Sequence, residues 1–125
     1  MQKLVTTLFL FTALTYAFAQ EPQIERTRSF DLYGYTQSAR VGNVVYLSGI
    51  TGRGPIDQSI QGVYTRIGMA LKEAGTDFAH VVKENLFTTD IDSVKAHNEV
   101  RMRFYNGSSP AANLGTGRST LYARI

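Results

Sequence analysis

The sequence predicts an α+β fold in which a mixed β-sheet carries two helices on one face. The first observation is the run from Val44 to Ile50, rich in β-branched and aromatic residues, which is typical of a buried strand. The second is an amphipathic helical repeat after it, and the third is the predicted order of strand, strand, helix, strand, helix, strand. The 125 residues, 43% hydrophobic and 18% charged, fit one globular domain.

The chain enters the domain through a polar segment. Residues 20–28 contain Pro22 and no apolar pattern, so we expect an exposed leader there, with the domain itself spanning residues 29–125. A first strand is expected from Ser29 to Tyr35, where aromatic and aliphatic residues alternate with polar ones. Gly42-Asn43 forms a tight link into the strand at Val44–Ile50, which we expect to be buried on both faces and antiparallel to its predecessor.

The helix after this strand is the clearest periodic signal in the chain. A loop with Gly52, Gly54 and Pro55 precedes it, and Asp57 or Ser59 is placed to cap it. Gly75 is its expected C-terminal stop. The apolar stripe has helical spacing and consists of Ile60, Val63, Tyr64, Ile67, Ala70, Leu71 and Ala74.

Three further elements complete the fold. Val81 to Thr89 is expected to be a strand with a polar middle. A second helix is expected to start at a cap on Asp92 or Ser93 and to run to Tyr105, before the turn at Asn106-Gly107. Ala112 to Leu121 is expected to be a strand weakened by its glycines.

The N-terminus predicts export. Lys3 precedes an uncharged, largely apolar run that ends in Ala17-Phe18-Ala19, the pattern of a secretory signal peptide over residues 1–19. The run is interrupted by threonines and is too short for the ~20 apolar residues that span a bilayer. We therefore expect a mature protein that starts at Gln20 in the periplasm or outside the cell, without a stable membrane anchor.

Composition excludes several classes of function. The chain has no cysteine, and His80 and His97 have no partners at metal-ligand spacing, so we expect neither a metal site nor another cofactor. The formal charge of +3 is spread singly along the chain, which argues against nucleic-acid binding. Asp90 and Asp92 are explained as turn and cap residues, and composition and spacing identify no catalytic residue.

Taken in order, several segments resemble the RidA (YjgF/YER057c/UK114, "endoribonuclease L-PSP") family. They are Tyr35-Thr-Gln37, Gly42 to Gly49, Ala70 to Gly75, Val81-Val-Lys83 with Phe87, Asn98, and Pro110-Ala111. The resemblance implies a chorismate-mutase-like fold, a homotrimer and small-molecule pockets at the subunit clefts. A ribonuclease function finds no support in the basic residues or the histidines of this chain.

The resemblance also implies a chemistry and a set of ligand-binding residues. One branch of the family hydrolyses enamine and imine intermediates of the 2-aminoacrylate type to 2-keto acids and ammonia. The ligand-binding positions carried over are Tyr35, Ser48, Gly49, Asn98, Pro110 and Ala112. The active branch has a carboxylate-binding arginine after Pro-Ala, and this chain has Ala112. The family's last strand carries a water-orienting glutamate, and we expect this chain to lack the complete strand.

These features lead to one expected function and two alternatives. We expect an exported, divergent member that binds a small carbonyl- or carboxylate-bearing metabolite at trimer clefts. The first alternative is a working hydrolase similar to 2-iminobutanoate/2-iminopropanoate deaminase, with Arg118 or Arg53 replacing the missing guanidinium. The second is a non-catalytic protein-interaction module.

Overall fold

The computed structural model of the protein describes residues 21–30, 34–117 and 122–124. The predicted signal peptide and Arg118 lie outside these residues. The elements in chain order are β1 (Ile24–Phe30), β2 (Tyr35–Val41), β3 (Val44–Leu47), α1 (Ile56–Glu73), a 3-10 turn (Phe78–His80), β4 (Lys83–Thr88), α2 (Ile91–Ala96), α3 (Asn98–Tyr105), β5 (Ala111–Thr116) and β6 (Tyr122–Arg124).

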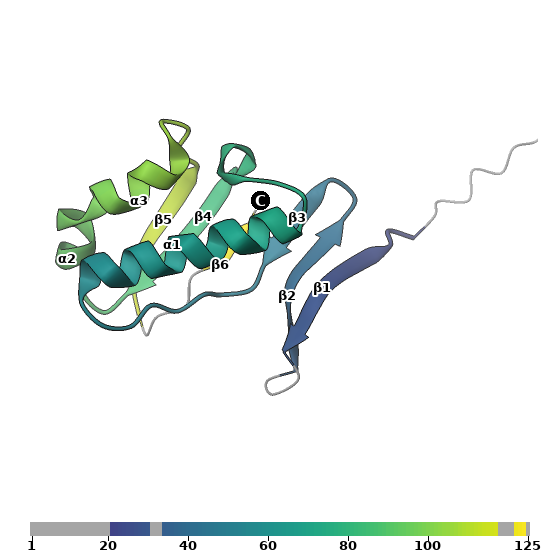
Figure 1. The fold of residues 1–125 in the computed structure, drawn as a ribbon, viewed down its shortest axis with the longest axis horizontal. Helices are drawn as coiled ribbons and strands as arrows, with labels where there is room; N and C mark the ends of the chain where they lie inside the picture. Colours follow the sequence, from purple (N-terminus) through teal and green to yellow (C-terminus); the bar gives the residue numbers. More distant parts are fainter. Residues whose placement is uncertain (1–20, 31–33, 118–121, 125) are drawn as a thin grey trace, which may run out of the picture.

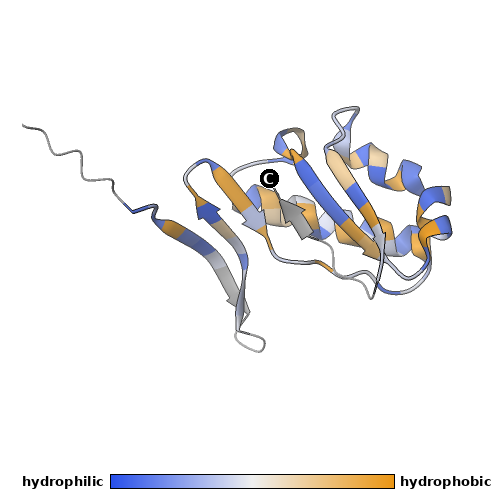
Figure 2. Cartoon of the chain, turned by 180° about the vertical axis from the view of Figure 1, so that it is seen from behind, coloured by the Kyte–Doolittle hydropathy of each residue, from blue (hydrophilic) through white to orange (hydrophobic). Residues whose placement is uncertain are grey.

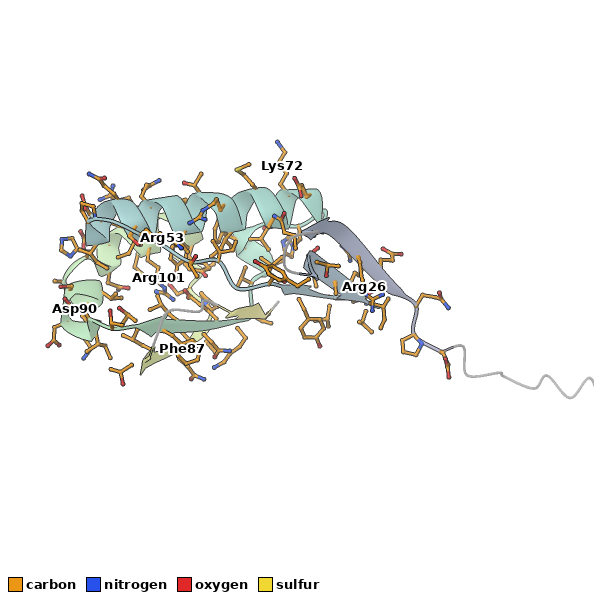
Figure 3. All side chains as sticks on the ribbon, turned by 90° about the horizontal axis from the view of Figure 1, so that it is seen from below. Arg26, Arg53, Lys72, Phe87, Asp90 and Arg101 are labelled. Atoms are coloured by element: carbon orange, nitrogen blue, oxygen red, sulfur yellow. The ribbon has the colours of Figure 1, made fainter. Side chains whose placement is uncertain are left out.

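The strands form one mixed sheet, which confirms the predicted fold class. The order across the sheet is β1-β2-β3-β6-β4-β5, with β4 and β5 parallel and the other pairs antiparallel. α1 lies along one side of the sheet, while the labelled Phe87 points away from the opposite side (Figures 1 and 3). The helices therefore cover a single face.

The predicted leader and first strand are wrong in their boundaries. The strand begins earlier, at Ile24, and Gly34 lies in the turn before β2 with a φ of +68°. Most of β1 is hydrophilic, as Figure 2 shows, and Ile24 is 48% exposed. Because β1 is an edge strand whose backbone is satisfied by β2, it needs no apolar face, and the hydropathy pattern could not reveal it.

β3 is covered on only one side within a single chain. Val45 and Leu47 are 3% and 5% exposed, whereas Tyr46 between them is 37% exposed. Side chains alternate across a strand, so Tyr46 lies on the face opposite the helices. The prediction of a strand buried on both faces is therefore wrong for one chain, although its antiparallel pairing with β2 is confirmed.

α1 confirms its predicted apolar stripe and corrects its predicted cap. All seven stripe residues are buried. The helix begins after Pro55, and neither Asp57 nor Ser59 caps it. At the C-terminus, Gly75 has a φ of +76° and its N–H donates to the Lys72 carbonyl, while the Thr76 N–H donates to the Leu71 carbonyl. This pair of bonds is a Schellman stop.

The expected second helix is two helices. α2 is capped by Asp90, whose carboxylate accepts the Ser93 N–H at 2.9 Å, and neither Asp92 nor Ser93 is the cap. His97, with φ −111° and ψ 22°, separates α2 from α3. The predicted end is confirmed, because Asn106 adopts the left-handed conformation at the C-cap.

The C-terminal strands also differ from the prediction. β5 ends at Thr116, so the expected strand from Ala112 to Leu121 is too long. β6, which has three residues, lies between β3 and β4 in the middle of the sheet. The sequence patterns did not indicate this short strand after β5.

A buried ion pair joins the sheet to both long helices. The Glu84 side chain on β4 is 1% exposed, and Arg101 on α3 donates to it through Nε at 3.0 Å and Nη2 at 2.5 Å. The hydroxyls of Tyr64 and Tyr105 also donate to the carboxylate. We call these four residues the Glu84 cluster, and its donors satisfy a charge that would otherwise be costly to bury.

No helix in the described part of the chain is long and apolar enough to cross a membrane.

Candidate functional site

Three of the predicted ligand-binding residues line one pocket. Tyr35, Ser48 and Gly49 surround a cavity of about 340 Å³, which we call the Ser48 pocket. The remaining described residues that line it are Gln37, Ile50, Thr51, Arg66, Met69 and Glu73. Its walls therefore come from the start of β2, the segment after β3 and one side of α1.

The end of β3 builds the floor of the pocket. The Ser48 N–H donates to the Gln37 carbonyl at 2.9 Å, and the Ser48 hydroxyl donates to the Thr36 carbonyl. These bonds hold the chain against β2 at the point where it leaves the sheet. Because the hydroxyl hydrogen is donated to the Thr36 carbonyl and not to a base, Ser48 is not arranged as a nucleophile. Its oxygen can still accept a hydrogen bond.

The segment from Ser48 to Pro55 runs back alongside α1 (Figure 1). Gly52 lies so close to the helix that a Cβ there would stand 2.0 Å from Ser59 Oγ and 3.0 Å from Val63 Cγ2. Glycine is thus needed at this position for the close approach. The contact holds the pocket wall, including Thr51, against α1.

No sequence pattern indicated the charged side chains of the pocket. Arg66 and Glu73 stand seven residues apart on α1, with Met69, 58% exposed, between them. All three lie outside the apolar stripe, where charged residues are usually solvated. Met69 was the one sequence feature that could have indicated a binding surface on this side of α1, because an exposed apolar side chain often marks a contact.

The other predicted site residues lie elsewhere. Asn98 begins α3 and accepts a 3.4 Å bond from Arg101, while Pro110 directly precedes β5 and Ala112 is its second residue. β2 and β5 are four strand positions apart, or about 19 Å at the usual spacing of ~4.8 Å. One chain therefore brings together half of the predicted site and leaves the other half near the far edge of the sheet.

A second cavity of about 530 Å³ lies at the other end of α1. Its polar lining includes Arg53, Ser59, Thr88, Asp90 and Ser93. The hydrogen bond from the Ser93 hydroxyl and the Ser93 N–H hold the pKa of Asp90 below its ordinary value, because both stabilise the carboxylate. Asp90 and Ser93 are thus engaged in capping, and Arg53 lines this cavity rather than the Ser48 pocket.

No group of three or more His, Asp or Glu side chains with metal-binding geometry occurs in the described residues. His80 pairs with Asp77 at 2.8 Å, and the hydrogen bond from His80 lowers the pKa of Asp77. His97 Nδ1 lies 2.9 Å from the Ser93 carbonyl oxygen. Both histidines therefore have local structural partners.

The arrangement of the Ser48 pocket suits a small polar ligand. A guanidinium, a phenol, a carboxylate and backbone groups beside a glycine surround a space large enough for a few heavy atoms. Arg66 can bind an anion, and Tyr35 and Glu73 are groups able to transfer a proton.

Comparison with known proteins finds relatives of this chain. The family model described as endoribonuclease L-PSP matches residues 28–116. A 2-iminobutanoate/2-iminopropanoate deaminase from Dermatophagoides farinae is 31% identical over 101 residues, covering 73% of this chain and 79% of that protein. A goat (Capra hircus) protein of the same name is 33% identical over 86 residues, and the alignment spans 62% of this chain and 63% of the goat protein.

Solved structures show the same fold at low identity. A Mycobacterium tuberculosis protein described as a member of the YjgF/YER057c/UK114 family has a TM-score of 0.74 at 23% identity, covering 82% of this chain and 98% of its own. A Thermotoga maritima protein described as a putative endoribonuclease has a TM-score of 0.70 at 22% identity, covering 80% of this chain and 90% of its own. By its matched residues and its fold, the chain belongs to the RidA family, whose family model is described as endoribonuclease L-PSP.

Proposed function

We propose that the protein binds a small carbonyl- or carboxylate-bearing metabolite in the Ser48 pocket and that a neighbouring copy completes the site. The observation that carries the proposal is the convergence of Tyr35, Ser48 and Gly49 on one cavity together with a cation. The volume of about 340 Å³ fits a molecule of metabolite size.

The strand order supports an assembled site. Asn98, Pro110 and Ala112 can approach the Ser48 pocket only from another chain, because the sheet separates them within one chain. The uncovered face of the sheet carries Tyr46 and Phe87, whose rings gain from burial. A homotrimer, as the family resemblance implies, would bury this face of the sheet. It would also bring Asn98, Pro110 and Ala112 of a neighbouring chain to the Ser48 pocket.

Binding can be measured directly. We expect 2-oxobutyrate to raise the melting temperature of the protein in a concentration-dependent way, because a ligand held only by the native state stabilises it. Ser48→Val should abolish the shift, since its branches crowd the pocket and it loses the hydrogen bond that holds this segment to the Thr36 carbonyl. Ser108→Val, an exposed position outside the pocket, is the matched control. No shift with any short 2-oxo acid would reject the proposal.

A deaminase activity is the second candidate, because relatives at about 30% identity bear that name. Position 112 has a methyl group where the active branch has a guanidinium, and loss of such a charge-assisted contact costs roughly 1.5–3 kcal/mol. We therefore expect no measurable acceleration of ammonia release from 2-aminoacrylate generated in situ by a dehydratase. Ala112→Arg should strengthen carboxylate binding. Robust turnover by the unmodified chain would instead establish the deaminase.

A further inference from the structure

The Ser48 pocket contains a guanidinium that no family position led us to expect. Among the described residues lining the pocket, Arg66 is the one cation. It projects from the fourth turn of the long helix α1, a rigid element that the buried stripe fixes to the sheet. Sites built on rigid helices hold their side chains with small positional error.

Two hydrogen bonds orient the Arg66 side chain. Nε donates to the Gly62 carbonyl at 3.2 Å, one turn back on α1, and Nη2 donates to the Thr51 carbonyl at 2.5 Å. Both acceptors are neutral, so they direct the guanidinium without cancelling its charge. These bonds use two of its five N–H groups, which leaves donors for a planar anion.

The Thr51 carbonyl is itself held in place by its neighbour. Gly52 packs against Ser59 and Val63 without room for a side chain, and this contact keeps the segment after β3 against α1. Gly52 therefore fixes the position of the Thr51 carbonyl, and this carbonyl in turn orients Arg66. Gly52 is a positioning residue for the cation, since it touches no ligand itself.

We propose that Arg66 is the carboxylate-binding residue of this protein and that the pocket selects carboxylates over neutral carbonyl compounds. The inference rests on the proposed function and narrows its ligand class. A carboxylate placed beside Arg66 would receive guanidinium N–H donors, and a neutral amide or ketone accepts such bonds less strongly. This guanidinium lies on α1, a different element of the fold from the family-type arginine position, which is Ala112 in this chain.

The test is titration calorimetry on the assembled protein with 2-oxobutyrate and its neutral amide, 2-oxobutanamide. The wild type should bind the acid at least tenfold more tightly than the amide. Arg66→Gln should weaken acid binding roughly 10- to 100-fold and leave amide binding nearly unchanged. The acid affinity of Arg66→Lys should fall between those of the wild type and Arg66→Gln, because lysine keeps the positive charge but lacks the forked N–H donors of a guanidinium.

Lys72→Gln is the matched control, since it removes the same charge from an exposed position of α1 outside the pocket. It should leave both affinities unchanged. Gly52→Ala should weaken acid binding less than Arg66→Gln does. The double variant Gly52→Ala with Ser59→Ala should recover part of this loss, because it removes the hydroxyl that the new Cβ would overlap. Equal acid affinity in the wild type and Arg66→Gln, or equal loss in Lys72→Gln, would overturn the role of Arg66 and leave the proposed function standing. A wild type that binds neither compound would overturn the proposed function itself.

Discussion

Glu84 shows what a single residue does for the stability of this protein. Its carboxylate is 1% exposed and accepts hydrogen bonds from Arg101, Tyr64 and Tyr105, which come from α1 and α3. In the sequence, Glu84 is visible only as part of the polar middle of a predicted strand. The alternation of Glu84, Leu86 and Thr88 on the buried face of β4 was the signal that could have identified it.

Glu84→Ala should destabilise the protein by about 3–5 kcal/mol, because it leaves the Arg101 guanidinium, 11% exposed, without its counter-ion. Urea unfolding at a fixed protein concentration measures the loss. The double variant Glu84→Met with Arg101→Met should lose much less than the sum of its single variants, since it removes both charges together. A loss below about 1 kcal/mol in Glu84→Ala would contradict the buried pair.

Tyr105 should make the protein sensitive to alkali. Burial, with the nearby charge of Glu84, raises the pKa of its hydroxyl well above the ordinary value. From about pH 10 upward the unfolded phenol loses its proton while the folded one keeps it, so stability falls as pH rises.

The slope from this one group is at most about 1.4 kcal/mol per pH unit. Tyr105→Phe should therefore lose less stability than the wild type between pH 9 and pH 11 in parallel urea titrations. Identical pH slopes would show that the tyrosine ionises equally in both states.

The site residues differ in how visible they were in the sequence. Tyr35, Ser48 and Gly49 could be predicted because they flank strands and match a motif. Arg66 could not, because its role depends on where the segment after β3 passes α1, and no local pattern encodes that approach. Ala112 was predicted as a lost contact, but its distance from the Ser48 pocket depends on the order of strands.

At the scale of elements, residue types located β3, from its run of β-branched and aromatic residues, and β4, from the β-branched ends around its polar middle. Hydrophobic periodicity identified α1, whose regular apolar row faces the core. It missed β1, whose stability comes from pairing with β2, and it joined α2 to α3 because a single dihedral change at His97 leaves no compositional trace. The predicted N-caps of α1 and α2 were wrong by a few residues, because several adjacent residues are able to cap a helix.

Two glycines of the α1 region should respond oppositely to alanine. At Gly62 a Cβ would meet nothing within 4 Å, so Gly62→Ala should stabilise the helix by up to ~1 kcal/mol. Gly52→Ala should destabilise by roughly 1–3 kcal/mol, because its Cβ would overlap Ser59 and crowd Val63. Thermal unfolding of both variants tests the pair. Equal shifts of the same sign would show that propensity alone, without the close contact, governs both sites.

The whole molecule should be an oligomer. A single sheet with helices on one face leaves the other face and the edges β1 and β5 open, which association would cover. Light scattering at micromolar concentration should give the mass of three chains. A monomer mass would remove the second half of the proposed site together with the trimer.

The cellular location of the protein is a separate prediction about the whole chain. Cleavage after Ala19 should yield a mature protein beginning at Gln20, recovered outside the cytoplasm. N-terminal sequencing of the protein from fractionated native cells tests this. Intact Met1 in the cytosolic fraction would reject the export proposal.

The place of β6 in the sheet has a consequence for how the protein is made. β1, β2 and β3 can pair as soon as they emerge from the ribosome, and β4 can pair with β5 in the same way. Among the described residues, the two halves of the sheet pair with each other only through β6, which follows the other described strands in the chain. Until it enters, β3 and β4 each expose an unpaired edge beside core residues, a state open to aggregation or chaperone capture. The slow, long-range step of folding should therefore be the closure of the sheet by residues 122–124, after translation has reached them.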